Sequence, residues 1–447
     1  MADPKDDRLE RFTAELRDAP APGPGAGLGR FARLLRGGLG LARSVAGRKS
    51  DEGPTEKDLA KIEALVTRLG ALKGLPMKMG QIMSYLELDL PEESRRLLCL
   101  LQTQSPATAF ARVEAILRED LGERAEPLLA GLERTPASVA SIGQVHRGRL
   151  PDGEDVAVKV RHPDIEAAIR SDFRSARVGT MFAAALMPGM GATAKDFVAE
   201  LEARLLEECD YALEATRQER FAGLYAGHPV IVVPAVRRDF SGPRVLTSAW
   251  EQGEDLEAFQ ARASQAERDR AGAALFELYI GTLYRHGLFH ADPHPGNYRF
   301  RPDGRVVVFD YGCVREFEPE VAAAFVALAE AMRDDDRARI TAALRGLGAE
   351  PSANDAAYAH LRGLLRSFFG PMLVSGPHRI EGRIVVDARR MMRDKLAIAR
   401  LRLPGRLMFL FRIRFGLFAV LSRLGSVNDW AALERGFARQ IGPGTAI

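Results

Sequence analysis

Cysteine is scarce in this chain of 447 residues, which has only Cys99, Cys209 and Cys313, all far apart in the sequence. This spacing argues against a disulfide framework and against the paired ligands of a structural zinc site, and it indicates a reducing compartment. A surplus of one charge is also absent. The formal net charge is +3 at neutral pH, so composition gives no reason to expect nucleic acid as a partner.

Long apolar runs are missing too. A membrane-spanning helix needs about 18 or more apolar residues, and the best candidates, Met181–Met190 and Leu407–Leu421, are interrupted by proline and glycine or by arginines. The N-terminus begins with acidic residues and lacks the apolar core of a secretory signal. With 46% hydrophobic and 28% charged residues, we expect a cytoplasmic globular protein of two or three domains' size, without a transmembrane span.

The stretch that is richest in chemistry is residues 286–312, HGLFHADPHPGNYRFRPDGRVVVFDYG. Asp292 and Asn297 form a D-x-x-x-x-N pattern, and Asp310 begins a D-Y-G motif after a β-branched stretch at 305–309 that predicts a short strand. A protein kinase catalytic loop has the same order, with H-R-D-x-x-x-x-N followed by a strand and D-F-G. On this pattern Asp310 and Asn297 would bind Mg²⁺ at the nucleotide phosphates, and Asp292 would be the catalytic base or orienting carboxylate.

Two other interpretations of this stretch compete with the kinase one. His290, Asp292 and His294 alternate and could form a metal cluster, but no further His or Cys cluster completes the ligand shell. His290 fits better as the first residue of an H-x-D turn that braces the loop. The stretch could also be a surface turn rich in proline and glycine, which would not explain an apolar strand that ends in D-Y-G.

Residues 138–160 predict a β-hairpin, because two alternating segments flank the turn Pro151-Asp152-Gly153. Val156, Val158 and Val160 would share one face of the second strand, and Lys159 would lie on the other. A V-A-x-K strand after a loop of small residues is typical of the kinase lysine that pairs with nucleotide phosphates. The expected nucleotide contacts are Ser138, Val139, Ala140, Ser141, Lys159, Ala249 and Trp250.

A kinase also needs a helical glutamate that pairs with this lysine. Residues 195–222 predict one long helix, and we choose Glu214 as the partner over Glu208 and Asp210, which come one to two turns earlier. Two strands are predicted at 230–233 and 244–250, followed by a hinge at 251–253. A helix at 266–286 then leads to the catalytic loop.

The N-terminal segments carry weaker signals. Residues 1–26 are expected to be disordered. Residues 27–49 are basic with interleaved leucines, which fits either an amphipathic helix on anionic lipid or a basic linker. Helices are predicted at 57–86 and 108–130. In the first of these, Lys78 and Gln81 share a face, and a packed lysine needs a carboxylate or phosphate partner unless it extends to solvent at the helix edge.

Taken together, the motifs resemble those of the UbiB-like atypical kinases, a family linked to ubiquinone (coenzyme Q) biosynthesis, over about residues 60–430. The resemblance rests on the following residues: Lys78-Met79-Gly80-Gln81 (K-x-G-Q), Ser141-Ile142-Gly143-Gln144-Val145-His146, VAVK ending at Lys159, Glu208-Cys209-Asp210 (E-x-D), Glu214, HADPHPGN, and Asp310-Tyr311-Gly312.

This resemblance implies an α+β, bilobal, protein-kinase-like fold with a helical N-terminal extension packed over the cleft. It implies ATP and Mg²⁺ as cofactors, weak or absent protein phosphorylation, and ATPase activity tied to quinone or isoprenoid-lipid biosynthesis at a membrane surface. An anionic membrane, a quinone or isoprenoid precursor and biosynthetic enzymes are the partners it suggests. Lys78, Gly80, Gln81, Glu208 and Asp210 would occlude or regulate the site. We expect segments at 1–50 (basic and disordered), 51–135 (extension), 136–253 (first lobe) and 254–447 (helical second lobe).

Three departures from the family pattern matter. The nucleotide loop reads Ser-Val-Ala-Ser in place of Ala-Ala-Ala-Ser, which keeps the absence of glycine and a stiff loop but leaves the nucleotide preference open. D-Y-G replaces D-F-G, and residues 101–106 match the family only in part. A Ser/Thr protein kinase and a nucleotide-binding pseudokinase scaffold stay as alternatives. The first lacks its A-P-E segment here, and the second does not need the full set of metal and phosphate residues.

Overall fold

The computed structural model describes residues 107–140, 142–171, 173–174, 202–349, 354–381 and 416–440. The chain divides into two compact units. Unit 1 runs to Ala215 and also takes in Val236–Trp250, whereas unit 2 consists of Thr216–Ala235 and the chain from Glu251 onward. The division therefore places 216–235 in unit 2, although we expected this segment in the first lobe.

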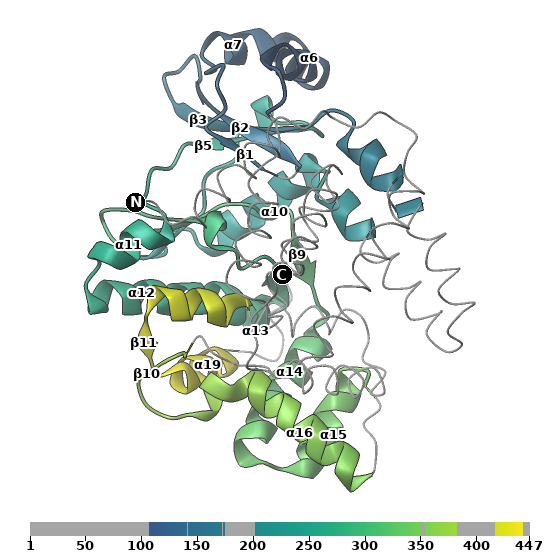
Figure 1. Ribbon diagram of the computed structural model, residues 1–447, viewed down its shortest axis with the longest axis vertical. Coiled ribbons are helices and arrows are strands. Elements are labelled where there is room, and N and C mark those ends of the chain that lie inside the picture. The colour runs from purple at the N-terminus through teal and green to yellow at the C-terminus, as the bar shows by residue number, and fades with distance from the viewer. Residues whose placement is uncertain are drawn as a thin grey trace, which may run out of the picture. The chain divides into compact units, whose positions relative to one another are not determined.

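Unit 1 is built on an antiparallel sheet in the order β1-β2-β3-β5 (Figure 1). Its strands are β1 (Ser138–Val139), β2 (Gly143–Arg149), β3 (Asp155–Arg161) and β5 (Val245–Ala249). The predicted alternation holds, since Val156, Val158 and Val160 are almost fully buried. They pack in one core with apolar side chains of the helices α6 (Phe110–Leu121) and α7 (Ala125–Ala130), which are joined by the turn η1 (Gly122–Arg124).

The single helix predicted over 195–222 is interrupted at 208–210 in the structure. Residues 202–207 are helical, residues 208–210 are not, and a new helix, α10, begins at Tyr211 and runs to Leu224. Asp210 causes the restart, because its carboxylate accepts a hydrogen bond from the Leu213 backbone N–H at 3.0 Å. Aspartate is among the residues preferred as N-caps for this reason, and the helical periodicity alone did not distinguish a cap from an interior position.

Unit 2 is mainly helical. The sequence after β5 forms α11 (Leu256–Arg262) and then α12 (Gln265–Phe276), the π-helical turn η3 (Glu277–Gly281) and α13 (Thr282–His286), which together fill the helix predicted at 266–286. The later helices are α14 (Pro319–Asp334), α15 (Arg337–Gly346), α16 (Asp355–Phe369) and α19 (Trp430–Ala438), with the turn η5 (Gly370–Leu373) after α16. These helices share one large apolar core.

Short strands flank the predicted catalytic-loop residues of unit 2. Parallel β4 (Ile231–Val232) and antiparallel β7 (Tyr298–Phe300) flank β8 (Val306–Val308), the strand predicted before D-Y-G. Strand β6 (Leu288–His290) pairs with β9 (Val314–Glu316), and β10 (His378–Arg379) pairs with β11 (Val427–Asn428). The described part of the chain is thus a mixed α+β fold. Among these residues, no helix has both the length and the apolar character needed to cross a membrane.

Candidate functional site

The predicted partner of Lys159 is present in the structure. The Nζ of Lys159 donates to both carboxylate oxygens of Glu214, at 2.8 and 3.0 Å. The Glu214 side chain is 2% exposed and that of Lys159 is 19% exposed, so the pair is nearly dehydrated but open on the lysine side. Lys159 Nζ also lies 4.9 Å from the centroid of the Tyr211 ring, a cation–π distance. A charge held in this way is positioned to meet a further anion.

The turn between β1 and β2 is tightly built. The Ala140 N–H donates to the Gly143 carbonyl at 2.8 Å. Gly143 must lack a side chain, because a Cβ there would come within 2.4 Å of the Tyr211 hydroxyl and 2.5 Å of the Val160 carbonyl. Ser138 and Ala140 are exposed and Val139 is half-buried. Main-chain and small side-chain groups are therefore what this turn offers to a ligand.

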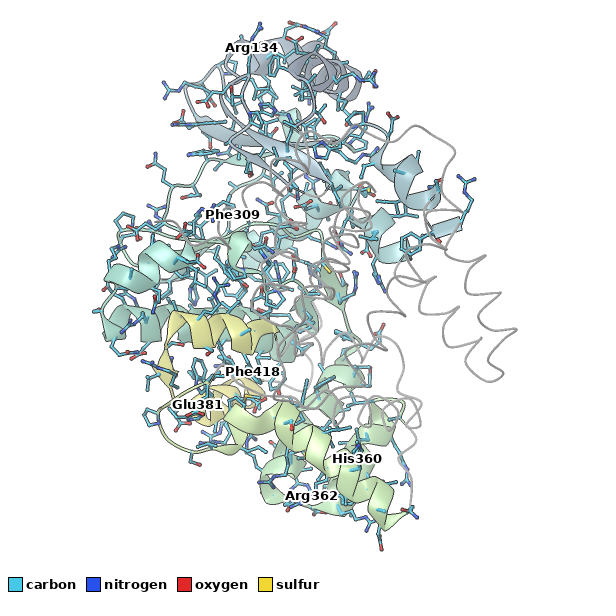
Figure 2. All side chains as sticks on the ribbon, viewed as in Figure 1. Arg134, Phe309, His360, Arg362, Glu381 and Phe418 are labelled. Atoms are coloured by element: carbon cyan, nitrogen blue, oxygen red, sulfur yellow. The ribbon has the colours of Figure 1, made fainter. Side chains whose placement is uncertain are left out.

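The predicted catalytic-loop residues Asp292 and Asn297 are hydrogen-bonded to one another within unit 2. The amide Nδ2 of Asn297 donates to the backbone carbonyl and to Oδ2 of Asp292, both at 3.1 Å. The backbone of Asn297, in the turn η4 (Pro295–Asn297), accepts from the N–H of Phe309 at 2.9 Å; Phe309 is labelled in Figure 2. The N–H of Ala291 donates to the Cys313 carbonyl at 2.6 Å. The residues on either side of Asp310 are thereby held against the Asp292 loop.

His290 braces this arrangement, as the H-x-D interpretation predicted. Its ring is fully buried and its Nε2 donates to the Asp310 carbonyl at 2.8 Å. Three aromatic rings, Tyr279, Tyr311 and Phe221, meet it edge-on. Burial lowers the pKa of His290. His294 instead bonds its own turn, since its Nδ1 accepts from the Gly296 N–H. Among the described residues, no group of three or more His, Cys, Asp or Glu side chains could hold a metal, which disfavours the alternative cluster.

Asp310 has a strained backbone, with φ at 55°. This left-handed conformation costs free energy for any residue with a Cβ and persists where the surroundings impose it, often at functional sites. Its Oδ1 accepts from the Gly312 N–H at 3.1 Å. Because Asn297 uses its amide nitrogen on Asp292, its oxygen is the amide atom left for a metal. One carboxylate and one amide oxygen, completed by phosphates and water, form the kind of set that Mg²⁺ takes in phosphoryl-transfer sites.

Only some of the remaining predicted residues lie in the part of the chain that the structure describes. The N–H of Trp250 donates to the Asp155 carbonyl at 2.9 Å, and its ring lies under the guanidinium of Arg147, so this N–H is not available to a nucleotide. Ala249 pairs with Val156 at the end of β5. Ser141, the basic stretch 27–49, and Lys78, Gly80 and Gln81 lie outside the described residues.

Sequence reasoning assigned no contact to Arg217, which lies one turn after Glu214 on α10. Its Nη1 donates to the Gly312 carbonyl at 2.8 Å. The bond joins α10 to the glycine of D-Y-G. The only sequence signal for this contact is the helical spacing, which places Arg217 on the same face as Glu214. An arginine by itself does not predict a bond to D-Y-G.

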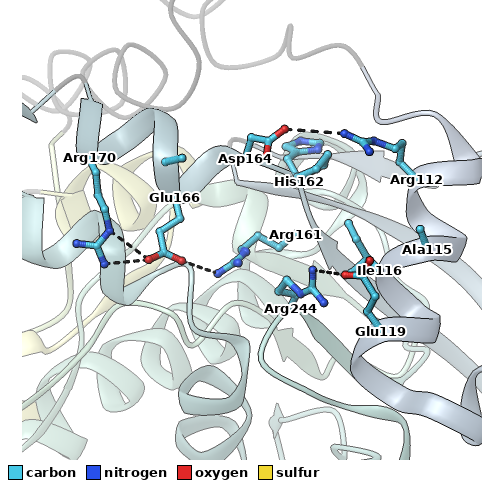
Figure 3. A pocket seen from close by; sticks show the side chains of 12 residues that line it. Arg112, Ala115, Ile116, Glu119, Arg161, His162, Asp164, Glu166, Arg170 and Arg244 are labelled. Atoms are coloured by element: carbon cyan, nitrogen blue, oxygen red, sulfur yellow. Dashed lines mark hydrogen bonds and ion pairs between the residues drawn. The ribbon is translucent and has the colours of Figure 1, made fainter. Parts of the chain in front are cut away.

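Unit 1 also contains a polar pocket of about 450 Å³ (Figure 3). Four arginines line it, among them Arg161 and Arg170, which both bond Glu166, and Arg244, which bonds Glu119. Its acids and bases largely neutralise each other. None of the residues predicted to contact nucleotide lines this pocket, so we assign it no part in the candidate site.

Gln144 and His146 of the S-x-G-Q-V-H motif are both buried, at 1% and 0% exposed. The His146 Nδ1 lies 2.8 Å from the Glu133 carbonyl, which can only accept, so Nδ1 carries the proton. The other ring nitrogen, Nε2, then accepts from the Gln144 amide at 2.8 Å. Burial lowers the pKa of His146, in agreement with a neutral ring. A second ring proton would face the Gln144 NH₂ group.

We therefore expect acid to destabilise unit 1 through His146. A pKa that is lower in the folded state than in the unfolded state gives stability that is complete above about pH 6.5 and is lost as the pH falls below it, by up to about 1.4 kcal/mol per pH unit. His146→Asn lacks this titration. The melting temperature of wild type should exceed that of the variant at pH 7.5, and the gap should narrow by about 2–4 °C per unit between pH 6.5 and 5.5. Parallel curves would contradict a neutral His146.

Comparison with known proteins identifies the family. Residues 100–344 match the ABC1 atypical kinase-like domain, and the chain belongs to this family. It is 32% identical to the uncharacterized protein sll0005 of Synechocystis over 65% of this chain and 43% of that protein. It is 28% identical to AarF domain-containing protein kinase 1 of Xenopus laevis, over 62% of this chain and 54% of the kinase.

Atypical kinase COQ8B of Danio rerio is 26% identical over 71% of this chain and 50% of that protein. The chain thus spans about half the length of these curated relatives. Among solved structures, Rv3197 of Mycobacterium tuberculosis, determined in complex with erythromycin, superposes with a TM-score of 0.59 and 28% identity, covering 84% of this chain and 96% of that one. These findings confirm the predicted UbiB-type family and its kinase-like α+β fold.

Proposed function

We propose that this chain is an ATP- and Mg²⁺-dependent atypical kinase or ATPase that supports ubiquinone or other isoprenoid-lipid metabolism at a membrane surface. The observation that carries the nucleotide part is the bidentate Lys159–Glu214 pair. A buried carboxylate that fixes a strand lysine, with the ammonium still partly exposed, is the arrangement a kinase uses to bind nucleotide phosphates. Family membership supports the same assignment.

Each unit contributes its own residues to this proposal. In unit 1, Lys159 binds phosphate oxygens and Glu214 orients it, while the turn at 138–141 covers the nucleotide. In unit 2, Asn297 and Asp310 hold Mg²⁺, which supplies charge neutralisation at the phosphates. Asp292 accepts the proton of the attacking hydroxyl or water, or orients that group, and its own carboxylate is held by the Asn297 amide.

The membrane part of the proposal rests on the basic segment at 27–49 and on the family. Each Lys or Arg near an anionic surface contributes about 1 kcal/mol, so contact through this segment would be peripheral and salt-sensitive. We further propose that the K-x-G-Q segment, with Lys78, Gly80 and Gln81, restricts access of protein substrates, together with Glu208 and Asp210.

Phosphate release by the full chain tests the activity. We expect Mg²⁺-dependent ATP hydrolysis without added protein, stimulated by cardiolipin-containing liposomes and a quinone-like phenol, and little label on a generic protein substrate. Ready phosphorylation of generic proteins would favour the protein kinase alternative. ATP binding without turnover under every condition would favour the pseudokinase scaffold.

Asp292→Asn separates chemistry from binding in the same assay. The amide is isosteric and still presents an oxygen to the Asn297 amide, so the loop should hold its shape. Loss of a general base or orienting carboxylate should lower kcat by about a hundredfold or more, whereas the KM for ATP should stay within about threefold of wild type. Equal kcat values for the two proteins would remove Asp292 from its proposed role.

A further inference from the structure

The chain reaches α6 through Thr108, and this residue is held by the motif that the nucleotide proposal leaves unused. The Thr108 N–H donates to the Gln144 Oε1 at 2.6 Å, and the Gln144 Nε2 donates to the Thr108 carbonyl at 3.2 Å. The side-chain amide of Gln144 thus bonds both the backbone N–H and the backbone carbonyl of Thr108. Gln144 lies on β2, at the start of the strand that follows the nucleotide turn.

A hydrogen bond to His146 fixes the orientation of the Gln144 side-chain amide. Its amide nitrogen also donates to the Nε2 of His146, whose other nitrogen bonds the Glu133 carbonyl. Reversing the amide would place its oxygen against the lone pair of His146 and the Thr108 carbonyl, and its NH₂ against the Thr108 N–H. Buried polar groups that lose their hydrogen-bond partners destabilise the arrangement. The bonds from the Glu133 carbonyl through His146 to Gln144 therefore fix which end of the Gln144 amide faces the Thr108 N–H.

A second link runs from Thr108 to the nucleotide turn itself. The Thr108 hydroxyl lies 2.7 Å from the Nδ1 of His162, and the His162 Nε2 lies 3.3 Å from the Ala140 carbonyl. A carbonyl only accepts, so Nε2 is the donor in the second of these bonds. The His162 N–H also donates to the Ile142 carbonyl at 2.8 Å. His162 thus joins both sides of the turn to Thr108.

We propose that Gln144 and His162 are positioning residues that bind Thr108 to the nucleotide turn, so that the placement of the chain before α6 sets the affinity of the turn for ATP. This rests on the proposed function of residues 138–141 in binding ATP. Coupling of two sites is reciprocal. ATP should therefore slow exchange of the backbone amides at 107–110, and weakening the Thr108 anchor should weaken ATP binding.

Thr108→Val tests the hydroxyl link with little change of shape, because the backbone bonds to Gln144 remain. We expect the dissociation constant for Mg²⁺–ATP to rise about fivefold, as for the loss of one hydrogen bond, and deuterium uptake at 138–143 to rise even without nucleotide. Thr108→Ser restores the hydroxyl and should restore both values. Arg118→Gln, which removes an exposed ion pair between α6 and Glu126 of α7, is the matched control and should behave as wild type.

Gln144→Leu should have the larger effect, at least about tenfold, but it removes three bonds from a buried site and could unfold unit 1, so Thr108→Val decides. If wild type binds ATP and Thr108→Val shows unchanged affinity and unchanged exchange at 138–143, the inference is overturned while the proposed function stands. If wild type binds no ATP, the proposed function fails. The rise in exchange at 138–143 without nucleotide would then still support the anchor, and its absence would reject it.

Discussion

Replacing Glu214 by Gln is expected to lower kcat/KM for ATP by at least about tenfold. The carboxylate is 2% exposed and makes two bonds to Lys159. Removing one member of a buried pair costs about 3–5 kcal/mol, because the other charge stays desolvated without its partner, and 1.4 kcal/mol already corresponds to a factor of ten. The amide of Gln keeps the size of the side chain. A loss of kcat/KM would therefore reflect the missing charge and the altered orientation of Lys159, since the packing is unchanged.

Two controls sharpen this experiment. Glu219→Gln changes an exposed acid on the same helix and should leave ATP use within about twofold of wild type. Glu208→Gln tests the rival choice of acid, since Glu208 precedes the helix break that separates it from α10. A larger loss of nucleotide affinity for Glu208→Gln than for Glu214→Gln would show that we chose the wrong acid.

A double-mutant cycle with Lys159→Met measures the pairing directly. If Glu214 acts only by holding Lys159, the double variant should be no worse than Lys159→Met alone, because the interaction has already been lost. Additive losses would mean that the two side chains contribute independently.

The hairpin and the catalytic loop could be predicted from the sequence because their signals are local. Strand alternation at Val156–Val160 and the turn at 151–153 fix which face Lys159 occupies, and the structure agrees. The choice of Glu214 also agrees. The helix break at 208–210 was missed because an aspartate such as Asp210 can either cap a new helix or lie within a continuing one. The apolar periodicity does not distinguish these two positions. Long-range contacts to residues that no motif marks have no local signal.

Gln144 and Arg217 illustrate this last point. Gln144 belongs to the S-x-G-Q-V-H motif, yet its partner Thr108 is 36 residues away. Nothing in the sequence of either segment predicts the hydrogen bond between them. Arg217 meets a backbone carbonyl 95 residues further on. The positive φ of Asp310 could not be predicted from the sequence either, because aspartate adopts a positive φ only where the fold requires it.

Asp310→Asn is expected to abolish the Mg²⁺-dependent part of ATP binding and to lower turnover by at least about a hundredfold. A metal that stabilises phosphate charge contributes several kcal/mol, which corresponds to two or more powers of ten in rate. Asparagine tolerates the left-handed backbone about as well as aspartate, and its Oδ1 can still accept from the Gly312 N–H. The replacement thus removes a charge and leaves the local conformation possible.

Calorimetric titration with ATP, in Mg²⁺ and in EDTA, measures this effect without relying on turnover. Wild type should bind more tightly with Mg²⁺, whereas Asp310→Asn should bind equally weakly in both. Asp303→Asn, a more exposed acid that pairs with Arg305 between β7 and β8, should retain the wild-type difference. Melting temperatures near wild type would show that the fold is intact. Unchanged Mg²⁺–ATP affinity in a normally melting Asp310→Asn protein would remove Asp310 as the metal ligand, since no structural loss could then mask the result.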